Sequence, residues 1–589
     1  MMVCVGGVTM QFSIRKSWGW LLAASGMLLC TLLYPFRRRV LGRLLRLPPL
    51  QNHVRRTMHV EVRTPDGVCL RGDHYAPQIK GSAPTLLIRT PYGRNERHSI
   101  YGALLAFFAW RFAERGYHVL VQDVRGRFDS EGEFVPYLNE RADGLATLAW
   151  LRQQSWFNGK LGTWGPSYLG MVQWVIADQP EVGAMMPIFT GSRLHPVIFP
   201  DGVFSYGLMM RWIAILHVIE KYRGNLVFSA LLLPLEVERL VRRSLHHLPV
   251  NTGDTLIVGQ HAAYYDEWLA NTQPDAPLWQ QVNAMVDWAH IHAPVHLIAG
   301  WYDFFQRVQL EDYARLKGCG TTPYLTIGPW GHFNDANGLL TGLHEGLAWF
   351  EAHLKTRPAT SRPRPELTPR PDPVKVYISD LKQWHTLADY PPQTTPRALY
   401  LAKDQRLVET PPDQSGQAAY IYDPRDPTPA YGGAQFQLDL HPVKDNRRLE
   451  NRPDIITFTT EPLTDDLVIV GAVRLTLYVR TGGETADFYA RLCDLHPDGH
   501  SFNVCDGLFH LMEKTGCIEV DLWSAAHRFR AGHCLHLIIG GGAYPRWDRN
   551  PGVKVMPQSL DDLHIITETV YFGPEQPSRL MLPVFTPQP

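Results

Sequence analysis

Short apolar runs alternate with helix-length segments between residues 84 and 179, and this alternation restricts the fold more than any other feature of the sequence. The runs 84–90, 117–123 and 160–165 have the length and composition of buried strands. Helical patterns at 141–154 and 167–179 flank the last of these runs. Because strands that alternate with helices form a parallel sheet covered on both faces, the sequence predicts an α/β fold.

The flanking segments predict further units around this core. Two long helical patterns within 196–290 predict a helical cap, and strand patterns return before residues 303 and 332. A segment rich in proline and arginine follows, after which strands and turns dominate, as in an all-β domain of jelly-roll type. The predicted division is an N-terminal anchor with a basic flank (1–50), an α/β core in two parts (51–195 and 291–356), a helical cap (196–290), and a linker with a C-terminal jelly-roll β-sandwich (357–589).

A membrane anchor is predicted near the N-terminus. The segment Trp18–Phe36 carries no charge, is long enough to cross a bilayer, and is not followed by a small-residue cleavage site. Arginines are more frequent after this segment than basic residues before it, which predicts that the bulk of the protein is cytoplasmic. An amphipathic surface helix or a misassigned start codon is the alternative.

Charge and cysteine content exclude some partners. The 57 basic and 57 acidic residues cancel, and no basic domain stands out, so we expect no nucleic-acid partner. The eight cysteines include no CxxC pair and no Cys/His spacing typical of zinc, so no metal is expected. We expect free thiols at Cys493, Cys505, Cys517 and Cys534, with a disulfide as the alternative.

Ser167 stands between two glycines, in KLGTWGPSYLGM (160–171), where a predicted strand gives way to a predicted helix. A tight turn there would expose its hydroxyl at the carboxyl end of the sheet, beside a helix N-terminus that favours negative charge. The general nucleophile signature has glycine two residues after the serine, whereas here Leu169 takes that place and Gly170 follows. An ordinary strand-to-helix turn would also explain the pattern.

Asp303 and His332 supply what a nucleophilic serine needs. A serine hydroxyl needs a base, and the base needs an acid to orient it. Asp303 directly follows one predicted strand and His332 the next, and the carboxyl ends of parallel strands meet at one edge of a sheet. The chain order Ser, Asp, His is that of the α/β-hydrolase arrangement. The sequence therefore predicts Ser167 as nucleophile, His332 as base and Asp303 as orienting acid.

An acyl-transfer site also needs hydrogen-bond donors for the oxyanion. The backbone N–H of Tyr168 is the expected first donor, since it directly follows the nucleophile. Tyr92, in the loop RTPYGR after an early strand, could offer its phenol as the second. At this point a packing role for Tyr92 remains an equal alternative.

Several motifs in order resemble the CocE/NonD hydrolases, which include bacterial cocaine esterase, α-amino-acid ester hydrolases and X-Pro dipeptidyl-peptidases. The resemblance runs from about residue 55 to the end and rests on RTPYGR, DVRGRFDSEGEF, WFNGKLGTWGPSYLG, GWYDFF and GPWGHF, with FYARLCDLHPDGHS and FRAGHCLHLIIGGGAYPRWDRNP further on. It implies an α/β-hydrolase core, a helical cap and a C-terminal jelly roll, with the active site where they meet. It also implies no cofactor, and it assigns Tyr92 as the side-chain oxyanion donor beside the Tyr168 amide.

The resemblance also bears on the substrate. The family's amino-acid ester hydrolases carry two carboxylates two and three residues after the catalytic aspartate, where this sequence has Phe305 and Gln306. This departure favours a plain acyl ester with an apolar acyl group over a substrate with a free α-amine. We expect a serine hydrolase that cleaves small-molecule acyl esters through an acyl-enzyme. The alternatives are an X-Pro dipeptidyl-peptidase acting on short peptides and a non-catalytic scaffold that binds carbohydrate or protein.

Overall fold

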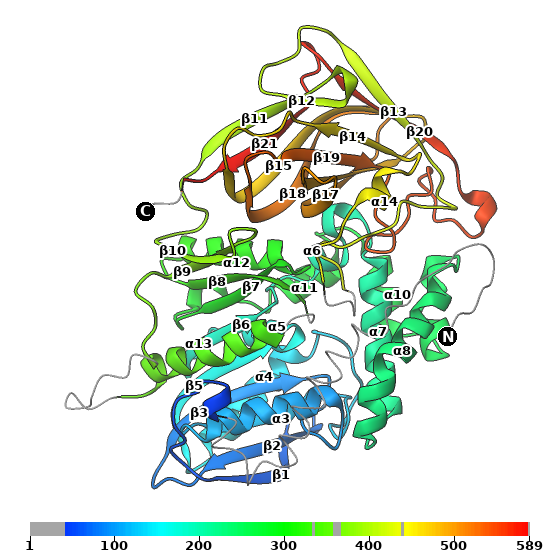
Figure 1. The fold of residues 1–589 in the computed structure, drawn as a ribbon. Helices are drawn as coiled ribbons and strands as arrows, with labels where there is room; N and C mark the ends of the chain where they lie inside the picture. Colours follow the sequence, from blue (N-terminus) through cyan, green and yellow to red (C-terminus); the bar gives the residue numbers. More distant parts are fainter. Residues whose placement is uncertain (1–41, 333–335, 357–366, 437–440, 587–589) are drawn as a thin grey trace.

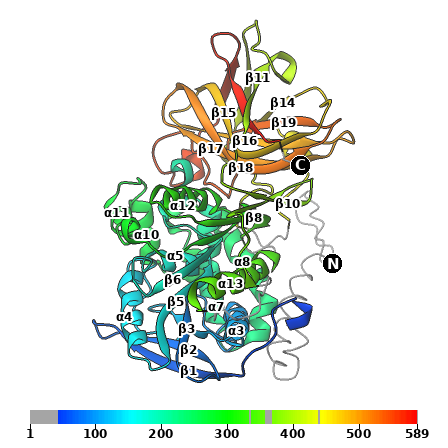
Figure 2. The same ribbon diagram turned by 90° about the vertical axis from the view of Figure 1, so that its left-hand side faces the viewer.

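The computed structural model describes residues 42–332, 336–356, 367–436 and 441–586. Figures 1 and 2 show a large twisted sheet with helices on both faces, helices α7 and α8 at one side, and a strand-rich C-terminal domain stacked on one end. The α/β class with a C-terminal β domain is confirmed.

The core sheet has ten strands and is mainly parallel. Strands β4, β3 and β5 to β9 run parallel to one another, whereas β1, β2 and β10 form antiparallel edges. In spatial order the strands are β1 (Val54–Arg63), β2 (Cys69–Pro77), β4 (His118–Asp123), β3 (Ala83–Thr90), β5 (Phe157–Pro166), β6 (Val182–Ile188), β7 (His296–Tyr302), β8 (Tyr324–Gly331), β9 (Val374–Ile378) and β10 (Gln383–Leu387).

Helices bury both faces of this sheet. Alternate residues of a strand point to opposite faces, and on β3 the side chains of Leu86 and Leu87 enter two different apolar clusters. Helices α3 (Ile100–Ala113) and α13 (Ala336–Leu354) contribute to the first cluster. Helices α4 (Glu140–Arg152) and α12 (Gln306–Gly318) contribute to the second. The continuous apolar character of β3 and β4 follows from burial on both faces.

The part of the chain between β6 and β7 forms a group of helices that covers the carboxyl edge of the sheet. Its longest members are α7, nearly all of whose residues are buried, and α8. These helices correspond to the predicted cap. The α-helices in this segment are α6 (His195–Ile198), α7 (Tyr206–Lys221), α8 (Leu226–Leu245), α9 (Thr255–Val258), α10 (Ala263–Ala270) and α11 (Pro277–Asn283).

The C-terminal β domain has its own apolar core, to which its inward-facing residues contribute in alternation. Its strands are almost all antiparallel, and the longest pair is β15 with β18. The strands are β11 (Thr395–Ala402), β12 (Arg406–Val408), β13 (Gly416–Tyr422), β14 (Ile455–Thr459), β15 (Leu467–Thr481), β16 (Ala486–Leu495), β17 (Ser501–Leu511), β18 (Thr515–Phe529), β19 (Cys534–Gly540), β20 (Ile566–Phe572) and β21 (Arg579–Val584). The four cysteines at 493, 505, 517 and 534 are free thiols.

The two sheets do not divide where the sequence division places the boundary. Strand β9, which the sequence pattern groups with the C-terminal strands, pairs in parallel with β8, and β10 turns back along β9. The change from one sheet to the other therefore comes after Leu387, within the segment that the sequence division assigns to the linker and the β domain. A short alternating strand carries the same pattern whichever sheet it joins, so sequence alone could not assign it.

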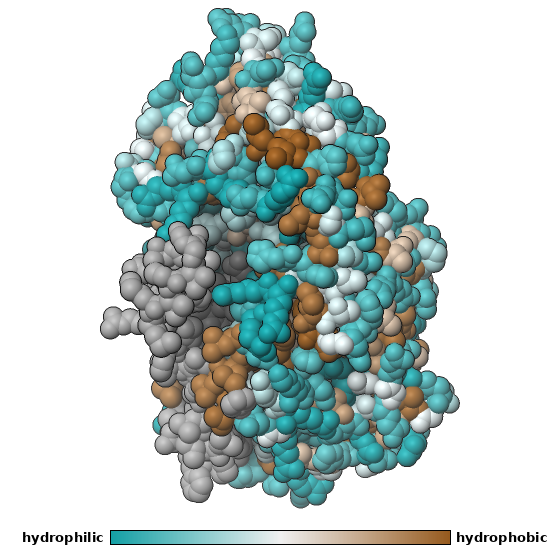
Figure 3. Space-filling model, turned by 90° about the vertical axis from the view of Figure 1, so that its right-hand side faces the viewer, coloured by the Kyte–Doolittle hydropathy of each residue, from teal (hydrophilic) through white to brown (hydrophobic). Residues whose placement is uncertain are grey.

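The predicted membrane-anchored localisation is corrected. Among the described residues, no helix combines the length and the apolar character needed to cross a bilayer. On the face drawn in Figure 3, apolar patches are broken up by hydrophilic residues. The predicted span Trp18–Phe36 lies outside the described residues.

Glu568 on β20 predicts a pH-dependent stability of the β domain. Its side chain is fully buried and accepts a hydrogen bond from Tyr420, while its Oε1 has no hydrogen-bond partner. Burial, reinforced by nearby Asp487 and Asp454, raises the pKa of Glu568 well above its usual value. The folded protein thus retains a proton that the unfolded chain releases above about pH 4.5, so this group lowers stability as pH rises.

We therefore expect Glu568→Gln to raise the melting temperature relative to wild type by more at pH 8 than at pH 5. The amide carbonyl can still accept from Tyr420, but it carries no ionisation cost. Thermal unfolding at the two pH values measures the difference. An equal gain at both would contradict a neutral carboxyl in the fold.

Candidate active site

The three residues predicted from strand ends meet at one point. Ser167 follows β5, Asp303 follows β7 and His332 follows β8. The Nε2 atom of His332 lies 2.9 Å from Ser167 Oγ, and its Nδ1 atom lies 2.7 Å from Asp303 Oδ2. All three residues are buried. The structure thus joins a hydroxyl, an imidazole and a carboxylate in one hydrogen-bonded chain.

The backbone at Ser167 is strained, and its neighbours explain the flanking glycines. Ser167 has φ 58° and ψ −128°, a conformation that residues other than glycine rarely adopt. A Cβ atom on Gly165 would lie 2.5 Å from the Cβ of Leu169, and one on Gly170 would lie 2.3 Å from Thr190 Cγ2. The tight turn therefore requires glycine at 165 and 170, and it tolerates Leu169 in the place where the general signature has glycine.

The imidazole of His332 is held in one orientation. The other carboxylate oxygen of Asp303 accepts a hydrogen bond from the Phe305 N–H at 2.7 Å, which fixes the carboxylate. Because this carboxylate accepts from Nδ1–H, Nε2 is left to accept from the serine hydroxyl. The rings of Phe304 and Phe436 pack against the imidazole, with centroids 4.2 and 5.7 Å away. These rings limit the access of water to the base.

Tyr92 and Tyr168 both lie beside Ser167, but they can offer different hydrogen-bond donors: Tyr92 its hydroxyl and Tyr168 its backbone N–H. The Tyr92 hydroxyl accepts a hydrogen bond from Trp212 Nε1 at 3.0 Å. Burial raises the pKa of Tyr92 to about 12, against the effect of its hydrogen bonds with Trp212 and Ser167, so the phenol keeps its proton to donate. The Tyr168 hydroxyl is engaged, since it donates to Glu140 at 2.6 Å. Its backbone N–H opens helix α5 (Tyr168–Trp174), where it has no acceptor within the helix.

Sequence reasoning missed Trp212 and Phe436. Trp212 comes from α7 of the cap and Phe436 from the segment before β14, so neither lies near a motif of the core. Their contacts with Tyr92 and His332 arise only when cap, core and β domain pack together. A single sequence carries no local signal for such contacts.

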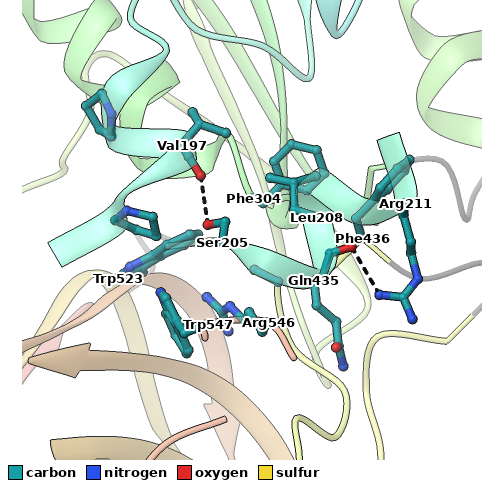
Figure 4. A pocket seen from close by; sticks show the side chains of 14 residues that line it. Val197, Ser205, Leu208, Arg211, Phe304, Gln435, Phe436, Trp523, Arg546 and Trp547 are labelled. Atoms are coloured by element: carbon teal, nitrogen blue, oxygen red, sulfur yellow. Dashed lines mark hydrogen bonds between the residues drawn. The ribbon is translucent and has the colours of Figure 1, made fainter. Parts of the chain in front are cut away.

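A pocket opens where the cap, the core and the β domain meet (Figure 4). It holds about 400 Å³ of space that protein atoms leave empty, part of it open to solvent. Phe304 and Phe436 line it and also pack on His332, so these two rings lie between the pocket and the base. Its other lining residues include Leu208, Arg211, Trp523 and Arg546.

A second pocket lies on the Tyr92 side of the serine, and its exposed lining is apolar; the space of about 350 Å³ between its protein atoms is partly open to solvent. The residues before and after the nucleophile turn, Pro166 and Leu169, line it together with Tyr92. Aromatic and aliphatic side chains of α3 and β5 complete it, among them Phe108 and Trp164. Its lining adjoins the nucleophile turn and contains no charged side chain.

Phe305 and Gln306, two and three residues after Asp303, contact other residues of the protein and carry no charge for a ligand. Phe305 packs on His332. Gln306 donates from Nε2 to the carbonyl oxygens of Trp301 and Ser524, at 2.9 and 2.8 Å, and so ties the core to the β domain. A nearby carboxylate, Asp201, is paired with Arg307 at 2.7 Å.

Two family models match this chain. One, described as X-Pro dipeptidyl-peptidase (S15 family), matches residues 66–334. The other, described as the X-Pro dipeptidyl-peptidase C-terminal non-catalytic domain, matches residues 368–581. The first match contains the triad, and the second spans β9 to β20 and the start of β21.

Named relatives and solved structures are similar over nearly the whole chain. Cocaine esterase of Rhodococcus sp. (strain MB1 Bresler) is 27% identical over 582 residues, covering 89% of this chain and 98% of that protein. A putative serine esterase of Mycobacterium bovis is 23% identical, covering 89% and 94%.

Among solved structures, an α-amino-acid ester hydrolase has a TM-score of 0.71 at 22% identity, covering 91% of this chain and 98% of that one. An aminopeptidase from a Thaumarchaeota archaeon of marine sediment has a TM-score of 0.74 at 19% identity, covering 91% and 97%. At these identities the structural likeness establishes the shared fold.

Proposed function

Because the chain belongs to the CocE/NonD family of serine hydrolases, we propose that it hydrolyses acyl esters through a triad of Ser167, His332 and Asp303. The observation that carries this proposal is the continuous hydrogen-bonded chain from the serine hydroxyl through the imidazole to the carboxylate. Two observations favour an ester over a substrate with a free amine. The relatives cited above are named as esterases. The third residue after Asp303 is Gln306, which is hydrogen-bonded within the protein and is not a carboxylate.

In acylation, His332 Nε2 takes the proton of Ser167 as Oγ attacks the ester carbonyl carbon. The carbonyl oxygen gains negative charge and receives hydrogen bonds from the Tyr92 hydroxyl and the Tyr168 N–H. The imidazolium then gives its proton to the departing alkoxide, which leaves as the alcohol. Asp303 accepts from Nδ1–H throughout and stabilises the positive charge on the imidazole.

In deacylation a water molecule takes the place of the alcohol. His332 removes one of its protons as its oxygen attacks the acyl-enzyme carbonyl, and the same two donors stabilise the second oxyanion. Collapse of this intermediate breaks the bond to Ser167, and the imidazolium returns the proton to Oγ. The products are a carboxylic acid and the free enzyme.

Cleavage of X-Pro dipeptides is the second candidate, because both family models carry that description. Rates on a Gly-Pro p-nitroanilide and on a p-nitrophenyl butyrate would separate the two. We expect the ester to be hydrolysed with the higher kcat/KM, even after correction for its greater chemical reactivity. These relatives do not support the other alternative, a non-catalytic scaffold that binds carbohydrate or protein.

Tyr92→Phe tests the side-chain oxyanion donor. The variant keeps the ring and its packing but removes the hydroxyl, so kcat should fall by about 10²- to 10³-fold. The protein should still fold, with a lower melting temperature because Trp212 Nε1 loses its acceptor. Steady-state rates on a p-nitrophenyl ester, with a melting curve, check both parts. Tyr75→Phe is the matched control, since it removes a buried hydroxyl on β2 that lies outside the site. Equal rates for wild type and Tyr92→Phe would leave the Tyr168 amide as sole donor.

A further inference from the structure

The guanidinium of Arg546 lines the pocket next to the base, and one of its nitrogen atoms has no hydrogen-bond partner. Its side chain lines the pocket and is buried, and its guanidinium lies 4.1 Å from the ring centroid of Trp547 and 4.9 Å from that of Trp523. Nη1 donates to Asp506, but the buried Nη2 has no hydrogen-bond partner. Figure 4 shows Arg546 beside Trp547 at the β-domain side of the pocket. A buried donor without an acceptor is costly, which suggests that a ligand supplies the acceptor.

The carboxylate behind Arg546 is shared with a second arginine. Asp506 is shared by two guanidiniums, because Arg491 also donates to it from Nε at 3.1 Å and from Nη2. Burial would raise the pKa of Asp506, but these two arginines outweigh burial and lower it to about 2. Asp506 is therefore engaged by both arginines, and its contact with Arg546 leaves Nη2 of that guanidinium without an acceptor.

The other charged groups near the pocket are already paired. Arg211, on the cap side, donates from Nε to Glu238 at 3.1 Å. Asp201 lies outside the pocket lining and pairs through Oδ1 with Arg307, although its buried Oδ2 has no hydrogen-bond partner. The buried Nη2 donor of Arg546 in the pocket lining therefore favours a ligand that supplies an acceptor.

The pocket's position indicates which part of a substrate it receives. His332 protonates the leaving alcohol, and the pocket begins at the two phenylalanines packed on that imidazole. The apolar pocket beside Tyr92 lies on the oxyanion side and suits the acyl chain. The alcohol part of the ester thus faces Arg546, Trp523 and Trp547.

On the basis of the proposed function, we infer that the natural substrate is an apolar acyl ester of a hydroxy acid, whose carboxylate is bound by Nη2 of Arg546. The indole rings at 523 and 547 provide a flat apolar wall that suits an aromatic or otherwise planar alcohol. A charge-assisted hydrogen bond from a desolvated arginine gives both affinity and selection for the anion.

Three butyrate esters with similar phenols test this inference: those of 4-hydroxybenzoate (anionic), 4-hydroxybenzamide (neutral) and 4-(aminomethyl)phenol (cationic). With wild-type enzyme we expect kcat/KM for the anionic ester to exceed that for the neutral one by about tenfold or more, as a charge-assisted hydrogen bond predicts. Arg546→Gln should reduce this ratio to about one and change the neutral ester's rate much less. Arg549→Gln is the matched control, because it removes a neighbouring buried guanidinium that does not line the pocket.

Competition in the wild-type enzyme gives an answer even if Arg546→Gln does not fold. We expect 4-hydroxybenzoate to inhibit hydrolysis of p-nitrophenyl butyrate at lower concentration than 4-hydroxybenzamide. Equal inhibition together with a ratio near one would overturn the inference, and so would a preference for the cationic ester, which would point to Asp201 instead. Labelling of Ser167 by a fluorophosphonate separates these outcomes from failure of the proposed function, because labelling requires the triad but no carboxylate.

Discussion

Replacement of Ser167 by alanine should lower kcat for ester hydrolysis by about 10⁶-fold, the largest effect expected of any single change in this protein. The variant loses the atom that forms the acyl-enzyme, whereas both oxyanion donors and the pockets remain. The residual rate would reflect binding and oxyanion stabilisation alone. Steady-state and single-turnover kinetics with p-nitrophenyl butyrate would measure the loss.

Ser244→Ala is the control for that experiment. Ser244 is also buried, but its hydroxyl donates to the Val241 carbonyl within helix α8, far along the chain from the triad. Its removal should leave kcat within a factor of about two, as is usual for a change that touches no reacting group. Wild-type-like turnover by a folded Ser167→Ala protein would remove Ser167 from the mechanism.

Asp303→Asn should lower kcat by about 10⁴-fold with little effect on KM. The amide has nearly the shape of the carboxylate, but it carries no charge to stabilise the imidazolium. Its carbonyl oxygen can accept from only one of the two present donors, Phe305 N–H and His332 Nδ1–H. If the amide turns its NH₂ group toward Nδ1, the imidazole takes the tautomer that cannot accept the serine proton.

Asp312→Asn is the matched control for the second prediction. Asp312 is a buried carboxylate on α12 that accepts from the backbone and hydroxyl of Ser192, and burial raises its pKa to about 7. An asparagine there resembles the protonated form that already exists near neutral pH, so kcat should change little. An equal loss of rate in the two variants would mean that Asp303 acts through folding rather than through His332.

The placement of the triad could be predicted from sequence for a physical reason. Strand and helix patterns locate the carboxyl ends of β5, β7 and β8, and parallel strands bring those ends to one edge. The glycines at 165 and 170 follow from the same local turn, because side chains there would collide with Leu169 and Thr190. The signal is local even though the three residues are far apart in the chain.

Features that depend on packing between units could not be predicted in the same way. Trp212 reaches Tyr92 from the cap at a position that no motif marks. Arg546 lies within the quoted motif at 529–551, but that motif does not indicate that its side chain reaches the pocket. The same limit applies to β9, whose alternating pattern fits either sheet. Apolar character over Trp18–Phe36 likewise led to a membrane-anchored localisation that the described residues do not support.

The central claim is that Ser167 becomes a nucleophile because His332 removes its proton. Peptide mapping by mass spectrometry after treatment with a fluorophosphonate tests it directly, in wild type and in His332→Ala. We expect one adduct, on Ser167, that forms rapidly in wild type and is nearly lost in the folded variant. Adducts on another serine, or undiminished labelling of Ser167 without the imidazole, would contradict the account.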